Sequence, residues 1–342
     1  MAADAVWRGR STGAAVARAA LLPASVGYGA AVSVRNYLYD QGLFAIRSPA
    51  VPTIAVGNLT VGGTGKTPIA AWLAGELLAR GARPAIVLRG YKGGDEALVH
   101  RALTPDAAVI VDPDRLAGIA LAAAGGSDIA ILDDAFQHRR AGRIANLVLL
   151  SADAWTTSRH LLPAGPWREP LSALRRATLV IVTRKAAGPA AVHAVCEAVR
   201  AVTDGVPIAV ASLTPDGLRT MAGETRPMDS LRGVHVHAVA GIGDPDAFFD
   251  QLRAAGANVT PHVVNDHHAY TPDEAARLAR GAGNAPVVCT LKDAVKLAPL
   301  WPRQVQALLY VSQRVGIDRG VEAVQAVLDE ACRARLSTLS TL

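Results

Sequence analysis

The sequence predicts an α/β fold in which a mostly parallel β-sheet carries helices on both faces. Short aliphatic runs alternate with helix-like stretches along most of the 342 residues. Between the first two runs, residues 65–80 place apolar side chains at Ile69, Leu73 and Leu77, the spacing of one helix face. Alternating strands and helices form parallel sheets that are covered on both sides, and this order therefore defines the fold class. The candidate strands span residues 53–56, 85–88, 129–132, 146–150 and 179–183.

A second, shorter series begins near Val234 and predicts a smaller α/β domain. Its second helix opens with Thr271 as cap, Pro272 in the first position and Glu274 completing the Thr-x-x-Glu box. A turn-rich stretch separates the two series. The expected elements of the second series are strands at 234–242, 258–264 and 285–290 and helices at 246–256 and after Thr271. The expected division is an N-terminal segment at 1–40, a main domain at 41–213, a linker at 214–233 and a smaller domain at 234–342.

The charge of the chain favours an anionic partner. Its net charge is +6 and its pI about 9.5, which suits a nucleotide, a phospholipid or nucleic acid. The basic residues are spread along the chain without an RGG tract or a Lys-rich tail, so we expect no nucleic-acid partner. Cys196, Cys289 and Cys332 lie far apart and form no C-x-x-C pair. This spacing predicts neither a zinc site nor a disulfide framework and fits a reducing compartment.

The N-terminal segment contains an uncharged run at residues 19–34, with Arg18 before it and Arg35 after it. A membrane-spanning helix needs about 20 apolar residues, and this run is shorter and is interrupted by Pro23 and two glycines. Two interpretations remain open on the residues alone. One is an interfacial segment with basic edges, and the other is a helix packed on the domain core.

The stretch AVGNLTVGGTGKTPIAAWL follows the first strand and opens the first helix. It nearly matches the phosphate-binding pattern G-x-x-x-x-G-K-[ST], except that Thr60 stands where the first glycine is usual. Threonine is tolerated there if its φ stays negative. The glycines let backbone N–H groups point at phosphate oxygens, and the helix start adds its positive dipole end. Lys66 would reach the β- and γ-phosphates, and the Thr67 hydroxyl would ligate Mg²⁺. The predicted ATP-binding residues are Thr60, Val61, Gly62, Gly63, Thr64, Gly65, Lys66 and Thr67.

A phosphate loop needs a carboxylate at the end of a nearby strand. Asp133 and Asp134 end the third apolar run and supply it. We expect one of them at the metal, and the residues leave open which one. His138, Arg139 and Arg140 follow and are expected to offset the charge of the two carboxylates.

Together, the motifs resemble those of the tetraacyldisaccharide 4'-kinase family, the lipid A 4'-kinases of Gram-negative bacteria. The resemblance spans nearly the whole chain, and the family also carries Thr at the place of Thr60. It implies ATP- and Mg²⁺-dependent phosphorylation of the 4'-hydroxyl of a tetraacyldisaccharide 1-phosphate. It also implies a P-loop domain, a smaller α/β/α domain and a cleft between them, with peripheral attachment to the cytoplasmic face of the inner membrane. That location favours the interfacial interpretation of the N-terminal segment. The motifs are VPTIAVGNLTVGGTGKTP, LRGYKGGDEAL, LDDAFQH, LPAGPWREP, AGIGDPDAFFDQL, NDHHAY and TLKDAVK, in that order.

The resemblance assigns catalytic roles to Asp95 in GGDEA and His267 in NDHHAY. Asp95 would take or direct the proton of the acceptor hydroxyl, and His267 would pair with it and make it a better proton acceptor. Lys66 would act with them at the phosphates. The two paired residues are expected to come from opposite domains, and His268 is the neighbouring competitor of His267.

The remaining site residues follow from the same resemblance. Glu96, Asp133 and Asp134 would join Thr67 around the metal, and His138 would lie in the same neighbourhood. Arg168 and Glu169 in LPAGPWREP would lie near the phosphates and the acceptor sugar.

Two other classes of function compete with the glycolipid kinase. A membrane-associated P-loop ATPase that acts as a switch would explain the phosphate loop and Asp134, but it has no need of GGDEA and NDHHAY. A kinase for a small soluble metabolite would not explain the uncharged N-terminal run. The glycolipid kinase and the ATPase switch differ in whether ATP turnover phosphorylates a lipid acceptor.

Overall fold

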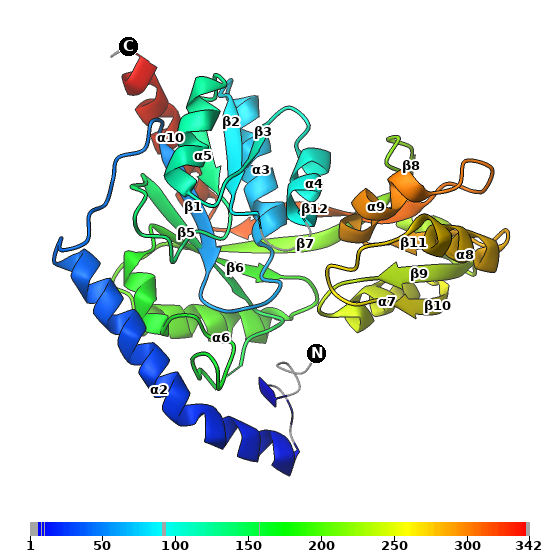
Figure 1. Ribbon diagram of the computed structural model, residues 1–342, viewed down its shortest axis with the longest axis horizontal. Helices are drawn as coiled ribbons and strands as arrows, with labels where there is room; N and C mark the ends of the chain where they lie inside the picture. The colour runs from blue at the N-terminus through cyan, green and yellow to red at the C-terminus, as the bar shows by residue number, and fades with distance from the viewer. Residues whose placement is uncertain (1–5, 8, 10, 91–93, 157, 340–342) are drawn as a thin grey trace. The chain divides into compact units, whose positions relative to one another are not determined.

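The computed structural model of the protein describes residues 6–339 except 8, 10, 91–93 and 157, and it forms two compact units (Figure 1). Residues 91–93 of the LRGYKGGDEAL motif and the N-terminal Arg8 and Arg10 thus lie outside the described residues. The division differs from the expected one because the segment around Asp95 belongs to the second unit and the C-terminal segment to the first. The first unit comprises Met1–Arg89, Asp106–Ser212 and Gly316–Leu342, and the second comprises Gly90–Pro105 and Leu213–Val315.

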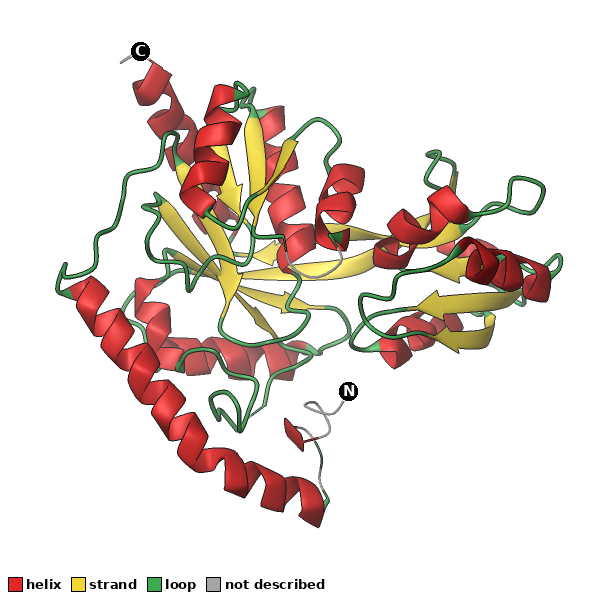
Figure 2. Ribbon diagram, in the orientation of Figure 1, coloured by secondary structure: helices red, strands yellow, loops and turns green. Residues whose placement is uncertain are grey.

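The first unit is built on a parallel sheet with the strand order β7-β6-β5-β1-β4-β2-β3 (Figure 2). All five strands expected in this region are present, and the edge strand β3 and strand β7 are additional. The strands are β1 (Thr53–Asn58), β2 (Pro84–Leu88), β3 (Ala108–Val111), β4 (Ile129–Leu132), β5 (Ala145–Ser151), β6 (Leu179–Arg184) and β7 (Ile208–Arg219). The helices are α2 (Thr12–Asp40), α3 (Lys66–Ala79), α5 (Arg115–Ala124), α6 (Pro189–Arg200), α10 (Val321–Leu339) and the 3₁₀ helix η1 (Leu171–Arg176).

Side chains alternate between the two faces of this sheet and bury both of them. Ala85 and Val87 of β2 pack in one cluster with Ile119 of α5. Ile86, between them, is also fully buried and points to the opposite face, where α3 packs on β1, β2 and β4. Burial on both faces explains why β4 is an unbroken aliphatic run and why Ile54, Ala55 and Val56 follow one another in β1.

The second unit has α/β/α layers around parallel strands in the order β10-β9-β11-β12. Ala238 of β9 packs with Phe248 of α7, and its neighbour Val239 packs with Ala275 of α8 on the other face. The strands are β8 (Thr225–Arg226), β9 (His235–Ala240), β10 (Asn258–Val263), β11 (Val287–Cys289) and β12 (Leu309–Arg319). The helices are α4 (Asp95–Leu103), α7 (Pro245–Ala254), α8 (Pro272–Ala282), α9 (Leu291–Leu297) and the 3₁₀ helices η2 (Met228–Leu231) and η3 (Ala298–Leu300). The capping box expected at Thr271 is present.

The region expected as a linker, residues 214–233, is part of the second unit. It holds the end of β7, the short strand β8 and η2. Leu218 and Leu231 are buried in the same core as the β9 side chains. The prediction of a linker was wrong because a turn-rich composition hid two residues that complete this core.

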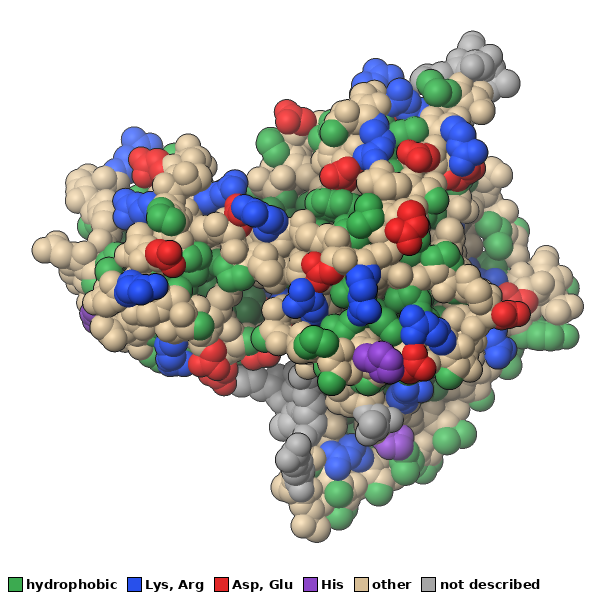
Figure 3. Space-filling model, turned by 180° about the vertical axis from the view of Figure 1, so that it is seen from behind, with side chains coloured by type: hydrophobic (Ala, Val, Ile, Leu, Met, Phe, Trp, Pro, Cys, Tyr) green, Lys and Arg blue, Asp and Glu red, His purple; other side chains and the backbone are tan. Residues whose placement is uncertain are grey.

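The N-terminal segment forms one continuous helix, α2, in spite of Pro23. By length and composition α2 could cross a membrane: the mean hydropathy of an 18-residue window is 1.3, and 11% of that window is buried. Figure 3 shows hydrophobic side chains along the outer edge where this helix runs, while Lys and Arg side chains are dispersed among acidic ones elsewhere on that face. The exposed apolar residues of α2 are Val16, Leu22, Val26, Val34 and Tyr37.

Candidate active site

The glycine-rich loop joins β1 to α3 in the first unit, as the sequence predicts. Gly62 and Gly65 have φ values of 121° and 85°, which side chains other than glycine rarely adopt. A Cβ atom on Gly62 or Gly63 would meet no other atom within 4 Å, so the space beside the loop is open. Gly65 is the N-cap of α3, and the first residues of that helix are Lys66 and Thr67.

The loop is fixed by contacts on both sides. Asn58 Nδ2 donates to Thr64 Oγ1 at 2.9 Å, and Thr183 Oγ1 donates to the Thr64 carbonyl oxygen at 2.9 Å. The Val61 N–H donates to the carbonyl oxygen of Pro166 at 2.8 Å. Thr60 forms an antiparallel bridge with Trp167 and keeps a φ outside the positive range, so threonine replaces the usual glycine without strain.

Lys66, Asp134 and Arg168 meet beside this loop. Lys66 Nζ lies 3.6 Å from Asp134 Oδ1, and Arg168 Nη1 donates to both carboxylate oxygens at 2.8 and 3.0 Å. Burial raises the pKa of Asp134, but the charges of Lys66 and Arg168 outweigh it and hold the pKa below its ordinary value. Asp134 is therefore ionised at neutral pH and lies against two cations.

The two adjacent aspartates point in different directions. Asp134 has a φ of 51°, and its side chain is 37% exposed, whereas Asp133 is buried. Of the basic residues expected to offset these carboxylates, Arg139 pairs with Asp40 and Arg140 pairs with Asp114. Asp134 pairs instead with Lys66 and with the distant Arg168.

His138 and Glu169 are held by other parts of the first unit. Burial, with the charges of Arg115 and Arg143, lowers the pKa of His138, which is therefore neutral at pH 7. Glu169 is fully buried and accepts hydrogen bonds from Asn36 Nδ2 at 2.8 Å and Arg176 Nη2 at 2.7 Å. Glu169 thus turns away from its neighbour Arg168 and towards α2.

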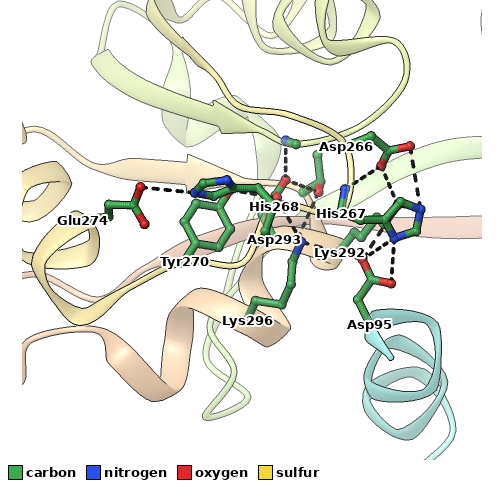
Figure 4. A network of polar contacts seen from close by, with 11 residues as sticks. Asp95, Asp266, His267, His268, Tyr270, Glu274, Lys292, Asp293 and Lys296 are labelled. Carbon is green, nitrogen blue, oxygen red and sulfur yellow. Dashed lines mark hydrogen bonds and ion pairs between the residues drawn. The ribbon is translucent and has the colours of Figure 1, made fainter. Parts of the chain in front are cut away.

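Asp95 and His267 lie together in the second unit (Figure 4). Asp95 is the first residue of α4 and is 1% exposed. His267 Nδ1 lies 3.1 Å from both carboxylate oxygens of Asp95. Because a carboxylate only accepts, Nδ1 carries the proton and donates it to Asp95. His268 instead lies 3.3 Å from Glu274. The expectation that Asp95 and His267 come from opposite domains was wrong, since α4 packs on α9 within one unit.

Two lysines of α9 complete this network and were not assigned a role from the sequence. Lys292 and Lys296 place their Nζ atoms 3.8 and 3.6 Å from Asp95 Oδ2. Lys292 Nζ also lies 3.3 Å from His267 Nε2, and Asp266 Oδ2 lies 3.8 Å from the same nitrogen. The spacing i, i+4 in TLKDAVK is the signal that both point to one side of a helix.

Asp293 fixes the elements that carry these groups. Its carboxylate accepts from Tyr270 Oη at 2.8 Å, from the Gly241 N–H at 3.0 Å and from Thr290 Oγ1 at 2.6 Å. Burial and the Asp293 charge raise the pKa of Tyr270 far above its usual range, so its hydroxyl remains a donor. The loop before α8 and the start of α9 are thereby held around Asp95.

The expected metal ligands are divided between the two units. Thr67, Asp133 and Asp134 belong to the first unit, whereas Glu96 follows Asp95 in the second. Among the described residues, no group of three or more His, Cys, Asp or Glu side chains is arranged to hold a metal ion. A magnesium ion beside a phosphate loop takes few protein ligands, and its position at these residues stays a prediction.

The protein is a P-loop protein with a phosphotransferase-type site. Its defining features are the parallel sheet, the glycine loop between β1 and α3 and the carboxylate after β4. The model of the tetraacyldisaccharide-1-P 4'-kinase family matches residues 17–333, and the chain belongs to this family. A tetraacyldisaccharide 4'-kinase of Geobacter sulfurreducens is 37% identical in a 331-residue alignment. The match covers 87% of this chain and 91% of that protein. Its counterpart in Halorhodospira halophila is 38% identical over 329 residues, which cover 90% and 91%.

A solved structure agrees with this assignment. The crystal structure of LpxK from Aquifex aeolicus in complex with ATP superposes with a TM-score of 0.73 at 29% sequence identity. The match covers 91% of this chain and 99% of that one. The likeness therefore extends over both compact units.

Proposed function

We propose that the protein transfers the γ-phosphate of ATP to the 4'-hydroxyl of a tetraacyldisaccharide 1-phosphate. Membership of the kinase family supports this reaction, and one observation carries it. Asp95 is a buried carboxylate that accepts a hydrogen bond from His267 Nδ1 and lies beside two lysines. A protein that only binds or hydrolyses ATP has no need of this arrangement, whereas transfer to a hydroxyl requires a group that directs the hydroxyl proton.

The residues of the first unit fit a triphosphate and a hard cation. The open glycine turn and the start of α3 offer backbone N–H groups to phosphate oxygens. Lys66 would neutralise charge on the transferred phosphoryl group, and Arg168 would hold Asp134 in place. The Thr67 hydroxyl and the Asp134 carboxylate are the oxygen donors that Mg²⁺ prefers, and the ion would supply further charge stabilisation.

The residues of the second unit fit the acceptor hydroxyl. Asp95 would accept its proton, and His267 would orient the carboxylate through Nδ1. Lys292 and Lys296 place positive charge beside the Asp95 carboxylate and would attract the negatively charged phosphoryl group. Phosphoryl transfer is largely a matter of such positioning and charge, because the transition state needs little covalent help.

The reaction is tested with γ-labelled ATP, Mg²⁺ and detergent-dispersed tetraacyldisaccharide 1-phosphate. We expect label to move onto the lipid in proportion to the ATP consumed. Lys66→Ala should abolish the transfer, while Lys185→Ala, an exposed lysine of the same unit, should preserve it. Release of label only as free phosphate, at a rate that the lipid does not change, would identify an ATPase switch instead.

We further propose that α2 attaches the protein to the cytoplasmic face of the inner membrane without crossing it. At 3.6 residues per turn, the exposed Val34 falls opposite to Ser25 and Asn36, and the exposed Val26 falls opposite to Tyr28. These three polar residues hydrogen-bond to the segment from Leu161 to Glu169. A helix tied along its length to its own domain can lay its other face on a membrane, but it cannot span one.

Flotation with phospholipid vesicles tests this attachment. We expect the protein to float with vesicles that contain phosphatidylglycerol and to be released at high pH and high salt, as peripheral proteins are. Val26→Asp combined with Val34→Asp should abolish flotation. Leu121→Asp combined with Val321→Asp, on exposed positions of other helices, is the matched control and should not affect it. Resistance to extraction would instead mean a spanning helix.

A further inference from the structure

Two adjoining cavities lie in the first unit at the ends of β1 and β5 where these strands begin. One has a volume of about 310 Å³ and the other about 410 Å³. They share Ile46, Gly142 and Arg143 in their walls. Volumes of this size suit small ligands. The phosphate loop follows the end of β1, whereas the larger cavity lies where β1 begins. Neither cavity contains a residue of that loop.

The smaller cavity is strongly basic. Arg139, Arg143 and Arg176 line it. Arg139 pairs with Asp40, and Arg176 shares the carboxylate of Glu169 with Arg35. The hydrogen bonds of Arg143 go to uncharged oxygens: the carbonyls of residues 135, 138 and 141 and the side-chain amide of Asn146. The cavity therefore has more positive than negative charge around it.

The positive charges of these guanidinium groups repel one another and affect the pKa of Arg143. Burial, together with the charges of Arg176 and Arg139, lowers the pKa of Arg143 to about 10. Arg143 is still protonated at neutral pH, and the repulsion among the three cations is relieved when an anion enters. Guanidinium groups match the oxygens of a phosphate with paired hydrogen bonds.

The larger cavity is lined by both apolar and polar residues, and Ile46 in its wall is one of three exposed hydrophobic residues that follow α2. Leu43, Phe44 and Ile46 follow α2 directly and are 68%, 43% and 54% exposed. Ile46 lines both cavities, so an exposed apolar side chain lies in their shared wall. The apolar residues that line the larger cavity are Ile46, Pro49, Ala50, Val51, Pro52, Ile144 and Ala334.

We propose that the paired cavities bind one anionic membrane phospholipid, with its phosphate between Arg139, Arg143 and Arg176 and an acyl chain along the apolar residues of the larger cavity. This inference rests on the proposed membrane attachment, because α2 would bring the cavities to the lipid surface. A phospholipid fits better than the acceptor glycolipid, since the phosphoryl group is transferred at the loop after β1 and neither cavity contains a residue of that loop.

Calorimetric titration with dihexanoyl phosphatidylglycerol below its critical micelle concentration tests the site. The probe is monomeric, so its binding depends neither on attachment of α2 to a bilayer nor on phosphoryl transfer. Failure of this inference can therefore be told apart from failure of the proposed function. Arg139→Gln removes one cavity cation whose partner Asp40 is exposed, and Ile46→Ser removes an apolar wall. Arg200→Gln, on the exposed face of α6, is the matched charge control.

We expect saturable binding that Arg139→Gln weakens about fivefold, the effect typical of one basic residue at an anionic lipid. Ile46→Ser should also weaken it, and Arg200→Gln should leave it unchanged. Equal losses in Arg139→Gln and Arg200→Gln would mean diffuse charge attraction and overturn the proposal. If inorganic phosphate binds as tightly as dihexanoyl phosphatidylglycerol, the site recognises a free anion and the proposal of a lipid site is wrong. Binding of the acceptor glycolipid at the same residues, without binding of the phospholipid, would reassign the cavities to the substrate.

Discussion

Replacement of Asp95 by asparagine tests the assignment of the proton-directing group. The change keeps the shape of the side chain but removes the negative charge that faces His267, Lys292 and Lys296. General bases contribute about 10²- to 10⁴-fold to enzymatic rates, so we expect kcat to fall by about 10³-fold. The affinity for ATP should stay the same, because the predicted phosphate contacts come from residues 60–67.

The same substitution has a structural cost that must be measured separately. Each lysine pair, at 3.6 and 3.8 Å, corresponds to about 4 kcal/mol of Coulomb attraction at an effective dielectric constant of about 20. Desolvation offsets most of this attraction, and Lys292 and Lys296 are 23% and 12% exposed. The expected net loss of unfolding free energy is therefore about 1–3 kcal/mol. The folded variant should still bind ATP.

The assay combines label transfer to the lipid, ATP titration and urea unfolding on the same preparations. Asp250→Asn, an exposed aspartate of α7 in the same unit, is the matched control and should retain wild-type values in all three. The reasoning fails if Asp95→Asn keeps a kcat within about threefold of the wild type, far below the contribution of a general base. It also fails if kcat falls only because ATP no longer binds.

Three further predictions address neighbouring groups. Lys296→Gln removes one of the two cations beside Asp95 and should lower kcat about tenfold with little change in the affinity for ATP, measured in the same label-transfer assay. Glu169→Gln leaves Arg176 and Arg35 facing a fully buried neutral group and should cost about 1–3 kcal/mol in urea unfolding; an unchanged midpoint would contradict the pairing. The pKa of His138 is lowered in the folded state, so the unfolded chain binds the proton first and stability should fall as the pH drops below about 6.5. His138→Gln should lose less stability than the wild type between pH 7.5 and pH 5.5, and equal losses in urea unfolding would show that His138 does not titrate in this way.

The phosphate loop and the sheet around it could be predicted because local sequence determines them. Lys66 begins α3 where the pattern requires, and the strands of the first unit are buried on both faces and therefore read as aliphatic runs. Strand β3 escaped prediction because it is a short edge strand with partly exposed residues. Pro23 interrupts the apolar run in the sequence, yet α2 continues through it, and the exposed position of Pro23 leaves room for the proline ring.

The Asp95 site could not be derived from the residues, because its members are 172 positions apart in the chain. Only the family resemblance joined Asp95 to His267. The unit to which α4 belongs depends on packing: Ala97 and Val99 are buried, and the helix contacts α9. Such tertiary contacts leave no local pattern. The pair Lys292 and Lys296 did leave one, since their spacing puts both ammonium groups on one side of α9.

The segment from Leu161 to Glu169 contacts both α2 and the phosphate loop, so an experiment on the proposed membrane attachment of α2 also affects the nucleotide site. Its Arg168 holds Asp134, and its backbone supports the phosphate loop at Thr60 and Val61. Tyr28 of α2 donates to the carbonyl oxygen of Arg168, and Asn36 donates to Glu169. Deletion of α2 would therefore remove the surface proposed to face the membrane and loosen the support of the nucleotide site together. Loss of activity after such a deletion says nothing about the membrane, whereas substitutions confined to the exposed face of α2 leave these hydrogen bonds intact and separate the two effects.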